Sequence, residues 1–370
     1  MQRPQERRSG LPAHYDERVR LALKKRGYSL DQPKLLAEAV KKLSDFYLEN
    51  PSSPTPWDDV WAQVASLVYF FPLNYSRSAL VAREAERLGF FEGVNALIDD
   101  GSGMGSGILA FKDHLKSQER SLVSWQARDV SHDALKLLKE LDQVDEAKIQ
   151  THVVHGVERS AHDHYGSTAL LASYVFTELH HLPKEWLKYD NLILIEPSTR
   201  EDARRLQAER PKLMEHGFEI WAPCPHQEDC PLLIHSDKDW CHDRLHFEAP
   251  LWFLEIEKLL PMKNRTLSFS YLVAKKKPSP VRASEGYVRL VGDTLEEKGK
   301  HRQSVCRGPA KEFLAWFPQR LKKGERIELE RGSLAHVQTE KLELKSSEVR
   351  VKAAEDIYEL ETDERLKSKS

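Results

Sequence analysis

Three of the four cysteines in this 370-residue sequence lie within one short segment, 221–242. Cys224, Cys230 and Cys241 follow the pattern C-x5-C-x10-C, and Cys306 follows after 64 further residues. Thiolates are soft ligands, and four of them complete a tetrahedral zinc site or a cubane iron–sulfur cluster. Three prolines stiffen the segment and disfavour a helix there. The segment 221–242 is therefore predicted to be a metal-binding loop.

Other interpretations of the cysteines are open at this point. Free cysteines are often small buried apolar residues, and cysteines of secreted proteins form disulfides. The grouping in one loop disfavours isolated structural thiols, and the N-terminus lacks the apolar core of a secretion signal. His226 and His242 stand beside cysteines of the loop. Either histidine could replace a cysteine as a ligand or hydrogen-bond to one.

A second candidate site is the glycine-rich segment 94–107. A short apolar stretch leads to Asp99 and then to Gly101, Gly103 and Gly105, after which a helix is expected. Glycines let the backbone approach a ligand closely and direct its N–H groups at it. The spacing differs from the dinucleotide fingerprint. It is typical of class I methyltransferases, which bind S-adenosylmethionine, and a purely structural turn is the alternative.

An acid that binds the cofactor ribose is expected after the next strand. The segment 121–128 is predicted to be that strand, and Asp129 stands near its end. A carboxylate there can accept hydrogen bonds from ribose hydroxyls. Alternatively, Asp129 caps the helix expected at 131–141. Asp133 is a second candidate for either role.

The surrounding elements predict an α/β fold. Apolar strands alternate with helical stretches, which predicts a mostly parallel, doubly wound, Rossmann-like sheet. The strands are expected at 94–98, 121–128, 149–154, 168–176 and 192–195, within a domain at 91–275.

Three further regions are expected to flank this domain. Residues 1–90 are predicted to be helical, with a helix beginning at Pro33 and a turn of the chain at 72–74. A small β-rich module is expected at 276–353, followed by a charged tail at 354–370. The module is predicted to have strands at 287–291, 326–330, 342–344 and 349–351 around a helix at 311–317.

The composition excludes some classes of partner. Charged residues make up 31 % of the chain, and the formal net charge is −2. A protein that coats nucleic acid through bulk charge would be strongly basic, so only a local basic face is compatible with RNA binding. No run approaches the roughly 20 apolar residues of a membrane span.

Several motifs together resemble one family, the methyltransferase-like proteins of the mitochondrial small ribosomal subunit and their bacterial relatives. The resemblance covers about residues 60–345. Its motifs are Gly101-Ser-Gly-Met-Gly105, the segment 173–179, Leu194-Ile-Glu-Pro197, Ala222-Pro-Cys-Pro-His226, Cys230-Pro-Leu232, Trp240-Cys-His242, Phe269-Ser-Tyr271 and Cys306-Arg307.

The resemblance implies a class I methyltransferase fold with a [4Fe–4S] cluster, acting with ribosomal RNA in assembly or translation of the small ribosomal subunit. The implied cluster ligands are Cys224, Cys230, Cys241 and Cys306. The implied S-adenosylmethionine loop contains Asp99, Gly101, Gly103 and Gly105. Such a protein is expected to be a monomer off the ribosome, in the bacterial cytoplasm or alternatively in the mitochondrial matrix.

Two residues depart from the family pattern, and both lie beside the glycines. Asp100 stands where the family tends to have an apolar or aromatic residue, and Met104 replaces a common proline. A second acid beside the loop is expected to weaken or alter cofactor binding.

No catalytic residue is predicted. A base-methylating Asn/Asp-Pro-Pro-aromatic motif is absent from the equivalent segment 173–179, whose one acid is Glu178. Three functions therefore stay open: an active RNA methyltransferase, a non-catalytic RNA-binding assembly factor with the same fold, and a zinc-stabilised enzyme of another class. The glycine spacing disfavours the third function, and the missing motif favours the second over the first.

Overall fold

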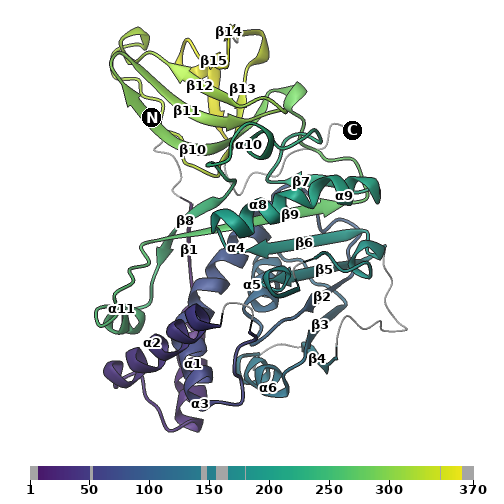
Figure 1. The fold of residues 1–370 in the computed structure, drawn as a ribbon, viewed down its shortest axis with the longest axis vertical. Helices are drawn as coiled ribbons and strands as arrows, with labels where there is room; N and C mark the ends of the chain where they lie inside the picture. Colours follow the sequence, from purple (N-terminus) through teal and green to yellow (C-terminus); the bar gives the residue numbers. More distant parts are fainter. Residues whose placement is uncertain are drawn as a thin grey trace.

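The protein is represented by a computed structural model that describes residues 7–50, 53–142, 148–155, 166–179, 181–341 and 343–360. A nine-stranded sheet covered by helices forms the larger part, and a seven-stranded sheet forms a smaller part at one end (Figure 1). Among the described residues, no helix has the length and apolar character that a membrane span requires.

Five parallel strands form the centre of the larger sheet, in the order β4-β3-β2-β5-β6. Next to β6 lies the antiparallel strand β9, which pairs with β7 and β8 along its other edge. The strand β1 adds to β8 in parallel. The bounds are β1 Arg8–Gly10, β2 Ala96–Asp100, β3 Ser124–Asp129, β4 Gln150–Val153, β5 Thr168–Ser173, β6 Asn191–Glu196, β7 Glu219–Ala222, β8 Asp243–Glu248 and β9 Thr266–Lys275. The predicted α/β sheet is confirmed.

The sheet is apolar on both faces because helices cover both. Alternate residues of a strand point to opposite faces. Accordingly, Ile193 and Ile195 of β6 belong to the hydrophobic cluster that includes α4 and α5, whereas Leu192 and Leu194 belong to a second cluster with Leu206 of α8. The helices are α1 His14–Lys25, α2 Pro33–Glu49, α3 Val60–Ala65, α4 Phe71–Arg87, α5 Ser106–Ser117, α6 His132–Leu141, α7 Phe176–Leu179, α8 Arg200–Ala208, α9 Arg210–Glu215, α10 Pro231–Ile234 and α11 Leu251–Glu257.

The expected N-terminal helices are present, but the chain does not turn at 72–74. A π-helical segment, Ser66–Phe70, runs directly into α4. Pro72 lies in the first turn of α4, where its missing N–H removes no hydrogen bond of the helix. The proline therefore begins a helix that the sequence pattern predicted it to interrupt.

The smaller sheet has the strand order β14-β15-β12-β11-β10-β13-β16. Its core contains Leu290, Leu314, Trp316 and Val349. The bounds are β10 Tyr287–Glu297, β11 Lys300–Cys306, β12 Glu312–Trp316, β13 Leu334–Val337, β14 Glu343–Lys345, β15 Glu348–Arg350 and β16 Ile357–Glu359. The β-rich character expected for this region is therefore observed.

Three details of this region differ from the sequence prediction. The helix expected at 311–317 is the strand β12, which pairs with β11 on one edge and β15 on the other. The segment 326–330 pairs with no strand among the described residues. The expected tail at 354–370 begins with structured residues, because β16 pairs with β13 and Leu360 is buried. Residues 361–370 lie outside the described residues.

Candidate metal centre and cofactor site

The four cysteines come from separate elements and line one small cavity. Cys224 follows β7, Cys230 immediately precedes α10, Cys241 precedes β8, and Cys306 is the last residue of β11. All four are free thiols, and three of them are buried, while Cys241 is half-buried. The structure thus brings together the four residues that the sequence indicated as metal ligands.

Cys306 reaches this cavity because β10 and β11 form an antiparallel hairpin. Arg289 of β10 lies opposite Cys306 in the register of the hairpin. Cys306 packs with Cys230, Leu232 and Val291 in a small apolar cluster. The smaller sheet therefore completes a site whose other three thiols belong to the loop 221–242.

Polar side chains that the sequence analysis did not identify also line the cavity. Gln207 lies in the last turn of α8 and Arg210 begins α9, and both are at most 2 % exposed. Among the residues that the structure describes, neither polar atom of the Gln207 amide has a hydrogen-bond partner, and the same holds for Arg210 Nε. Arg210 Nη2 donates a hydrogen bond to the carbonyl oxygen of His226 at 3.1 Å. No carboxylate among the described residues pairs with Arg210.

His226 and His242 have different places. His226 lines the cavity, and its Nε2 lies 3.1 Å from Cys306 Sγ. Burial first and Arg210 second lower the pKa of His226 to about 4, so the ring is neutral. The Nδ1 of His242 instead lies 3.2 Å from Nη2 of Arg331. His242 is not among the residues that line the cavity.

At neutral pH, the cavity disfavours deprotonation of all four cysteine thiols unless a cation is bound there. Burial raises the pKa of the Cys306 thiol well above its usual range, and the other three cysteines raise it further. Burial likewise raises the pKa of Cys224, with Arg210 acting in the opposite direction. A bound metal ion reverses this balance, because a coordinating thiol is deprotonated outright. The donor set therefore fits a centre that brings its own positive charge.

The thiols are not arranged around a single ion. Among the described residues, no group of three or more His, Cys, Asp or Glu side chains is placed to hold a metal ion. A mononuclear zinc site needs all four sulfurs about 2.3 Å from one centre. The metal centre therefore stays a prediction.

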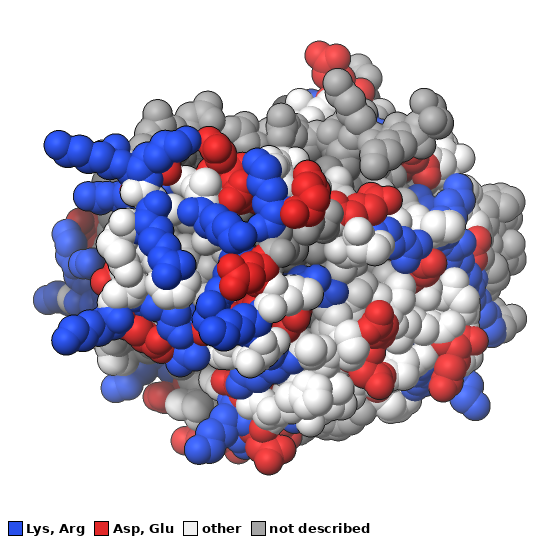
Figure 2. Space-filling model, turned by 90° about the horizontal axis from the view of Figure 1, so that it is seen from above, with Lys and Arg blue, Asp and Glu red and all other residues white. Residues whose placement is uncertain are grey.

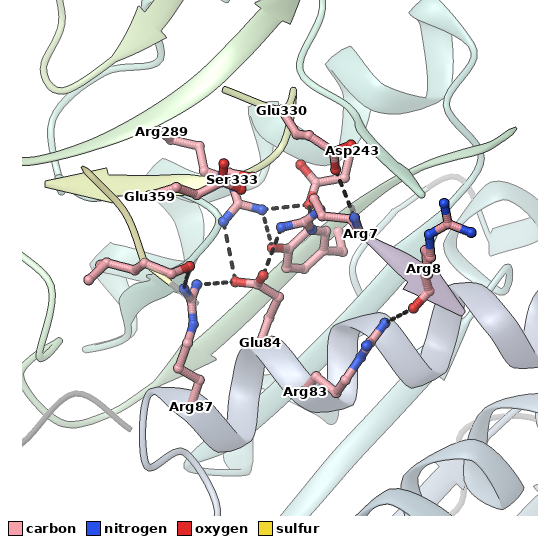
Figure 3. Close-up of polar contacts among 12 residues, drawn as sticks. Arg7, Arg8, Arg83, Glu84, Arg87, Asp243, Arg289, Glu330, Ser333 and Glu359 are labelled. Carbon is pink, nitrogen blue, oxygen red and sulfur yellow. Dashed lines mark hydrogen bonds and ion pairs between the residues drawn. The ribbon is translucent and has the colours of Figure 1, made fainter. Parts of the chain in front are cut away.

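Figure 3 shows a buried ionic network that includes Arg289, which also lines the cavity. Arg7 and Arg289 each contact Glu84 and Asp243, and Arg87 also contacts Glu84. All five side chains are at most 4 % exposed. They come from the residue before β1, from α4, from β8 and from β10, so the network ties the smaller sheet to the larger one.

The glycine loop connects β2 to α5 and lies between neighbouring side chains. Gly101 and Gly105 have φ values of +75° and +83°, which favour glycine. A Cβ on Gly101 would lie 2.4 Å from a methyl group of Val175, and one on Gly105 would lie 2.2 Å from a methyl group of Leu138. Close packing therefore requires glycine at both positions, independently of any ligand.

Three acids gather at the carboxyl ends of β2 and β3. Asp99 Oδ2 accepts a hydrogen bond from the Ile108 N–H at 3.1 Å, while its Oδ1 is buried without a partner. Burial raises the pKa of Asp99 to about 8, opposed by that hydrogen bond and supported by Asp100 and Asp129. The Trp186 indole donates to Asp100 Oδ2 at 2.6 Å.

Asp129 lies beside the glycine loop, as expected, but it also shapes that loop. Its Oδ2 accepts a hydrogen bond from the Gly103 N–H at 2.7 Å, and its Oδ1 accepts one from the Ser131 N–H at 2.8 Å. The cap of α6 is Ser131, whose side chain accepts from the Ala134 N–H. The alternative role of Asp129 as the cap of this helix is therefore wrong.

The remaining acidic candidates differ in position. Asp133 is exposed in the first turn of α6 and lies next to His132. Glu178 is exposed in α7, and its carboxyl group interacts with that of Asp129. Partial burial of the Glu178 carboxyl group, and secondly the negative charge of Asp129, raise the pKa of Glu178 to about 7. The charge of Asp129 therefore acts on Glu178, whereas Asp133 interacts with His132 instead.

The two candidate sites lie apart along the same edge of the sheet. β2, β5 and β6 run parallel to one another, and both β6 and β7 run antiparallel to β9. β2 and β7 therefore point in the same direction, and the glycine loop and Cys224 follow their carboxyl ends at the same edge of the sheet. The order β2-β5-β6-β9-β7 places four strand spacings between them. At about 4.8 Å per spacing, this is roughly 19 Å.

This strand order, with the antiparallel β9 between β6 and β7 and a glycine loop after β2, defines a class I methyltransferase fold. A family model described as "Mitochondrial small ribosomal subunit Rsm22" matches residues 63–322. Because the match covers more than half of the chain, the protein belongs to this family. No curated protein matches the chain.

Solved methyltransferase structures are similar only at a distance. TrmK from M. capricolum, in complex with S-adenosyl-homocysteine, is 12 % identical over 52 % of this chain and 69 % of its own, with a TM-score of 0.31. Ribosomal protein L11 methylase from Lactobacillus delbrueckii subsp. bulgaricus is 14 % identical over 55 % of this chain and 78 % of its own, with a TM-score of 0.28. Scores below 0.5 are too low to bear on function.

Proposed function

We propose that the protein is a ribosome-associated, S-adenosylmethionine-dependent methyltransferase-like protein with a [4Fe–4S] cluster, which acts on ribosomal RNA in assembly or translation of the small subunit. The observation that carries this proposal is the shared cavity of Cys224, Cys230, Cys241 and Cys306 in a member of the Rsm22 family. Membership connects the chain to the small ribosomal subunit, and the cavity supplies the cluster ligands.

The chemistry of the cavity supports a cluster. Four thiols provide the donor set, and the unpaired Arg210 guanidinium needs an anion beside it. A [4Fe–4S] centre with four thiolates has a net negative charge in its usual oxidation states, whereas four neutral thiols have none. When bound, the cluster supplies one-electron redox chemistry and a rigid link between the loop 221–242 and β11. Four strand spacings, roughly 19 Å, separate β7 from β2 and its glycine loop. We therefore propose a structural role for the cluster, as a link between the loop 221–242 and β11.

The acids around the glycine loop support S-adenosylmethionine. This cofactor carries a positive sulfonium and a positive ammonium group, and it supplies an activated methyl group when bound. The unpartnered Asp99 Oδ1 is a buried acceptor that a cation would satisfy. Asp129 retains acceptor capacity for ribose hydroxyls, because each carboxylate oxygen can accept two hydrogen bonds. Gly101, Gly103 and Gly105 would let the backbone approach the cofactor closely.

A non-catalytic assembly factor with the same fold is the second candidate function. It is favoured by the surroundings of Asp129, both of whose oxygens already receive backbone N–H groups of the protein. Glu178 is the only acid in the segment 173–179, and it is exposed. We assign no catalytic residue. Positioning alone can accelerate methyl transfer, so an active enzyme does not require one.

Two measurements test the proposal. Anaerobically purified protein is analysed for iron, acid-labile sulfide and zinc; about four irons and four sulfides per chain would support the cluster, and one zinc without sulfide would refute it. Transfer of a labelled methyl group from S-adenosylmethionine to small-subunit RNA would establish the enzyme. Cofactor binding without transfer would instead favour the assembly factor.

The RNA-binding surface is proposed to include the smaller sheet. Figure 2 views the molecule from the end formed by this sheet, and Lys and Arg side chains project from one side of that end with acidic residues among them. Exposed basic residues of this part include Lys298, Arg320, Lys322, Lys323 and Arg326. RNA binding through such contacts weakens steeply with salt.

The proposed protein is a monomer off the ribosome. Its compartment is the bacterial cytoplasm or, as the name of its family suggests, the mitochondrial matrix. Sedimentation of the purified protein tests the first statement, and immunolocalisation in the source cell tests the second.

A further inference from the structure

The cavity of the four cysteines contains more unsatisfied polar groups than thiols alone explain. Gln207, Arg210 and His226 are each at least 94 % buried and line it. Within the described part of the chain, the amide nitrogen and oxygen of Gln207, the Nε of Arg210 and the Nδ1 of His226 have no hydrogen-bond partner. A buried polar group without a partner pays the full cost of its lost hydration. The unpaired N–H groups of Gln207 and Arg210 therefore indicate an occupant that accepts hydrogen bonds.

The tautomer of His226 decides which atom donates the hydrogen bond between His226 and Cys306. If Nε2 carries the proton, it donates to Cys306 Sγ at 3.1 Å and leaves Nδ1 as an unpaired acceptor. In the other tautomer, a buried N–H would be left unpaired. Orphaned buried N–H groups are rarer than under-satisfied acceptors. The first tautomer is therefore favoured, with a sulfur atom as the acceptor.

Charge supports the same conclusion. Arg289, the other guanidinium at the cavity, shares Glu84 and Asp243 with neighbouring arginines. Arg210 contacts no carboxylate among the described residues, and the four cysteines line the same cavity. A buried cation needs an anion close by. The centre, counted together with its four cysteine thiolates, is therefore expected to be negatively charged as well as hydrogen-bond accepting.

We infer that Gln207, Arg210 and His226 form a cradle of N–H donors for the sulfur atoms of the metal centre, with Arg210 as its counter-charge. This inference rests on the proposed four-cysteine centre and adds residues that do not bind the metal themselves. Hydrogen bonds to sulfur and nearby charge set the reduction potential of iron–sulfur clusters. Groups that support metal ligands also change metal affinity by about 10–100-fold when mutated.

The test compares full-length, anaerobically purified variants. Arg210→Met removes the charge and the donors, Arg210→Lys retains the charge, and Lys212→Gln removes an exposed charge on the same helix as a matched control. The readouts are the midpoint potential by spectroelectrochemistry and the rate of iron loss to excess chelator. Gln207→Leu and His226→Leu provide two further variants that leave the charge of Arg210 in place.

Removal of the buried cation disfavours the more negative, reduced cluster. Arg210→Met should therefore shift the potential to a more negative value and accelerate iron loss about tenfold or more. Arg210→Lys should shift it less, and Lys212→Gln should match the wild type. Gln207→Leu and His226→Leu should each give a smaller negative shift, because each removes one donor.

Two results would overturn the inference in distinguishable ways. If the wild type holds a cluster but Arg210→Met, Gln207→Leu and His226→Leu retain its potential and its rate of iron loss, the cradle is refuted and the proposed function stands. If the wild type contains no iron, the proposed cluster and the inference built on it both fail. If Arg210→Met does not fold, an unchanged potential in both leucine variants still refutes the cradle.

Discussion

Replacing Glu84 by glutamine should destabilise the protein strongly, because this carboxylate holds three buried arginines together. Arg7, Arg87 and Arg289 lie 2.9, 2.5 and 3.3 Å from its oxygens. Burial alone would raise the pKa of Glu84, but these three guanidinium groups outweigh burial and hold the pKa well below its usual range. Breaking a buried ion pair costs about 3–5 kcal/mol. We expect a loss of that size in the free energy of unfolding at pH 7.

The same pKa shift predicts a pH dependence. The pKa of Glu84 is lower in the folded protein than the 4.5 of an unperturbed glutamate. Stability from this carboxylate is therefore present in full above pH 4.5 and is lost as the pH falls toward the folded-state pKa. The difference between the wild type and Glu84→Gln should shrink correspondingly in acid.

Urea unfolding followed by tryptophan fluorescence measures this loss. Glu255→Gln is the matched control, since Glu255 pairs with Lys258 at 2.5 Å on the surface, where the two side chains are 58 % and 66 % exposed. A pair of that kind contributes about 0–1 kcal/mol. If Glu84→Gln loses no more stability than Glu255→Gln, or if its loss is the same at pH 3 and pH 7, the network is not the anchor described above.

Three further variants test the two sites. Cys306→Ser should lose most of its iron and make the smaller sheet easier to cleave by protease, because the hydroxyl group is a poor ligand for iron; wild-type iron content in this variant would contradict the proposed ligand set. Gly105→Ala should destabilise the fold by about 2–4 kcal/mol, because residue 105 has a positive φ and the new methyl group would overlap Leu138. The control Gly217→Ala, at a position with a φ of +82° and free space around it, should cost about 1 kcal/mol. Equal melting temperatures of the two variants would refute the packing argument. Asp99→Asn should abolish binding of S-adenosylmethionine in calorimetry yet stabilise the protein at pH 9. The pKa of Asp99 is raised from 3.8 to about 8, so stability falls as the pH rises through this window and the folded carboxyl group ionises; unchanged stability of the variant at pH 9 would contradict this assignment.

Local spacing was sufficient to identify the cysteine loop and the glycine loop, but not Cys306, which the family resemblance supplied. The cysteine loop and the glycine loop each lie within a few turns of chain, so their residue types and separations carry the signal. Their strands were equally recognisable, because buried parallel strands such as β6 are continuous apolar runs. The position of Asp129 followed from the end of the strand before it.

Long-range partners could not be predicted in this way. Arg210 and Gln207 belong to helices whose sequences resemble any amphipathic surface helix, and only the fold turns them toward the cysteines. Arg7 contacts Asp243 across 236 residues of chain. The strand β12 was predicted to be a helix because a short run with Phe313 and Trp316 fits either structure, and its pairing on both edges decides between them.

The order of the four cysteines also matters while the chain is being made. Cys306 is translated 65 residues after Cys241. At about 5–20 residues per second, this takes roughly 3–13 s. During that interval three thiols are already present without the hairpin that supplies the fourth. The fourth ligand of the proposed cluster therefore becomes available only after β11 has been made, so loading of that proposed centre would follow synthesis of the smaller sheet.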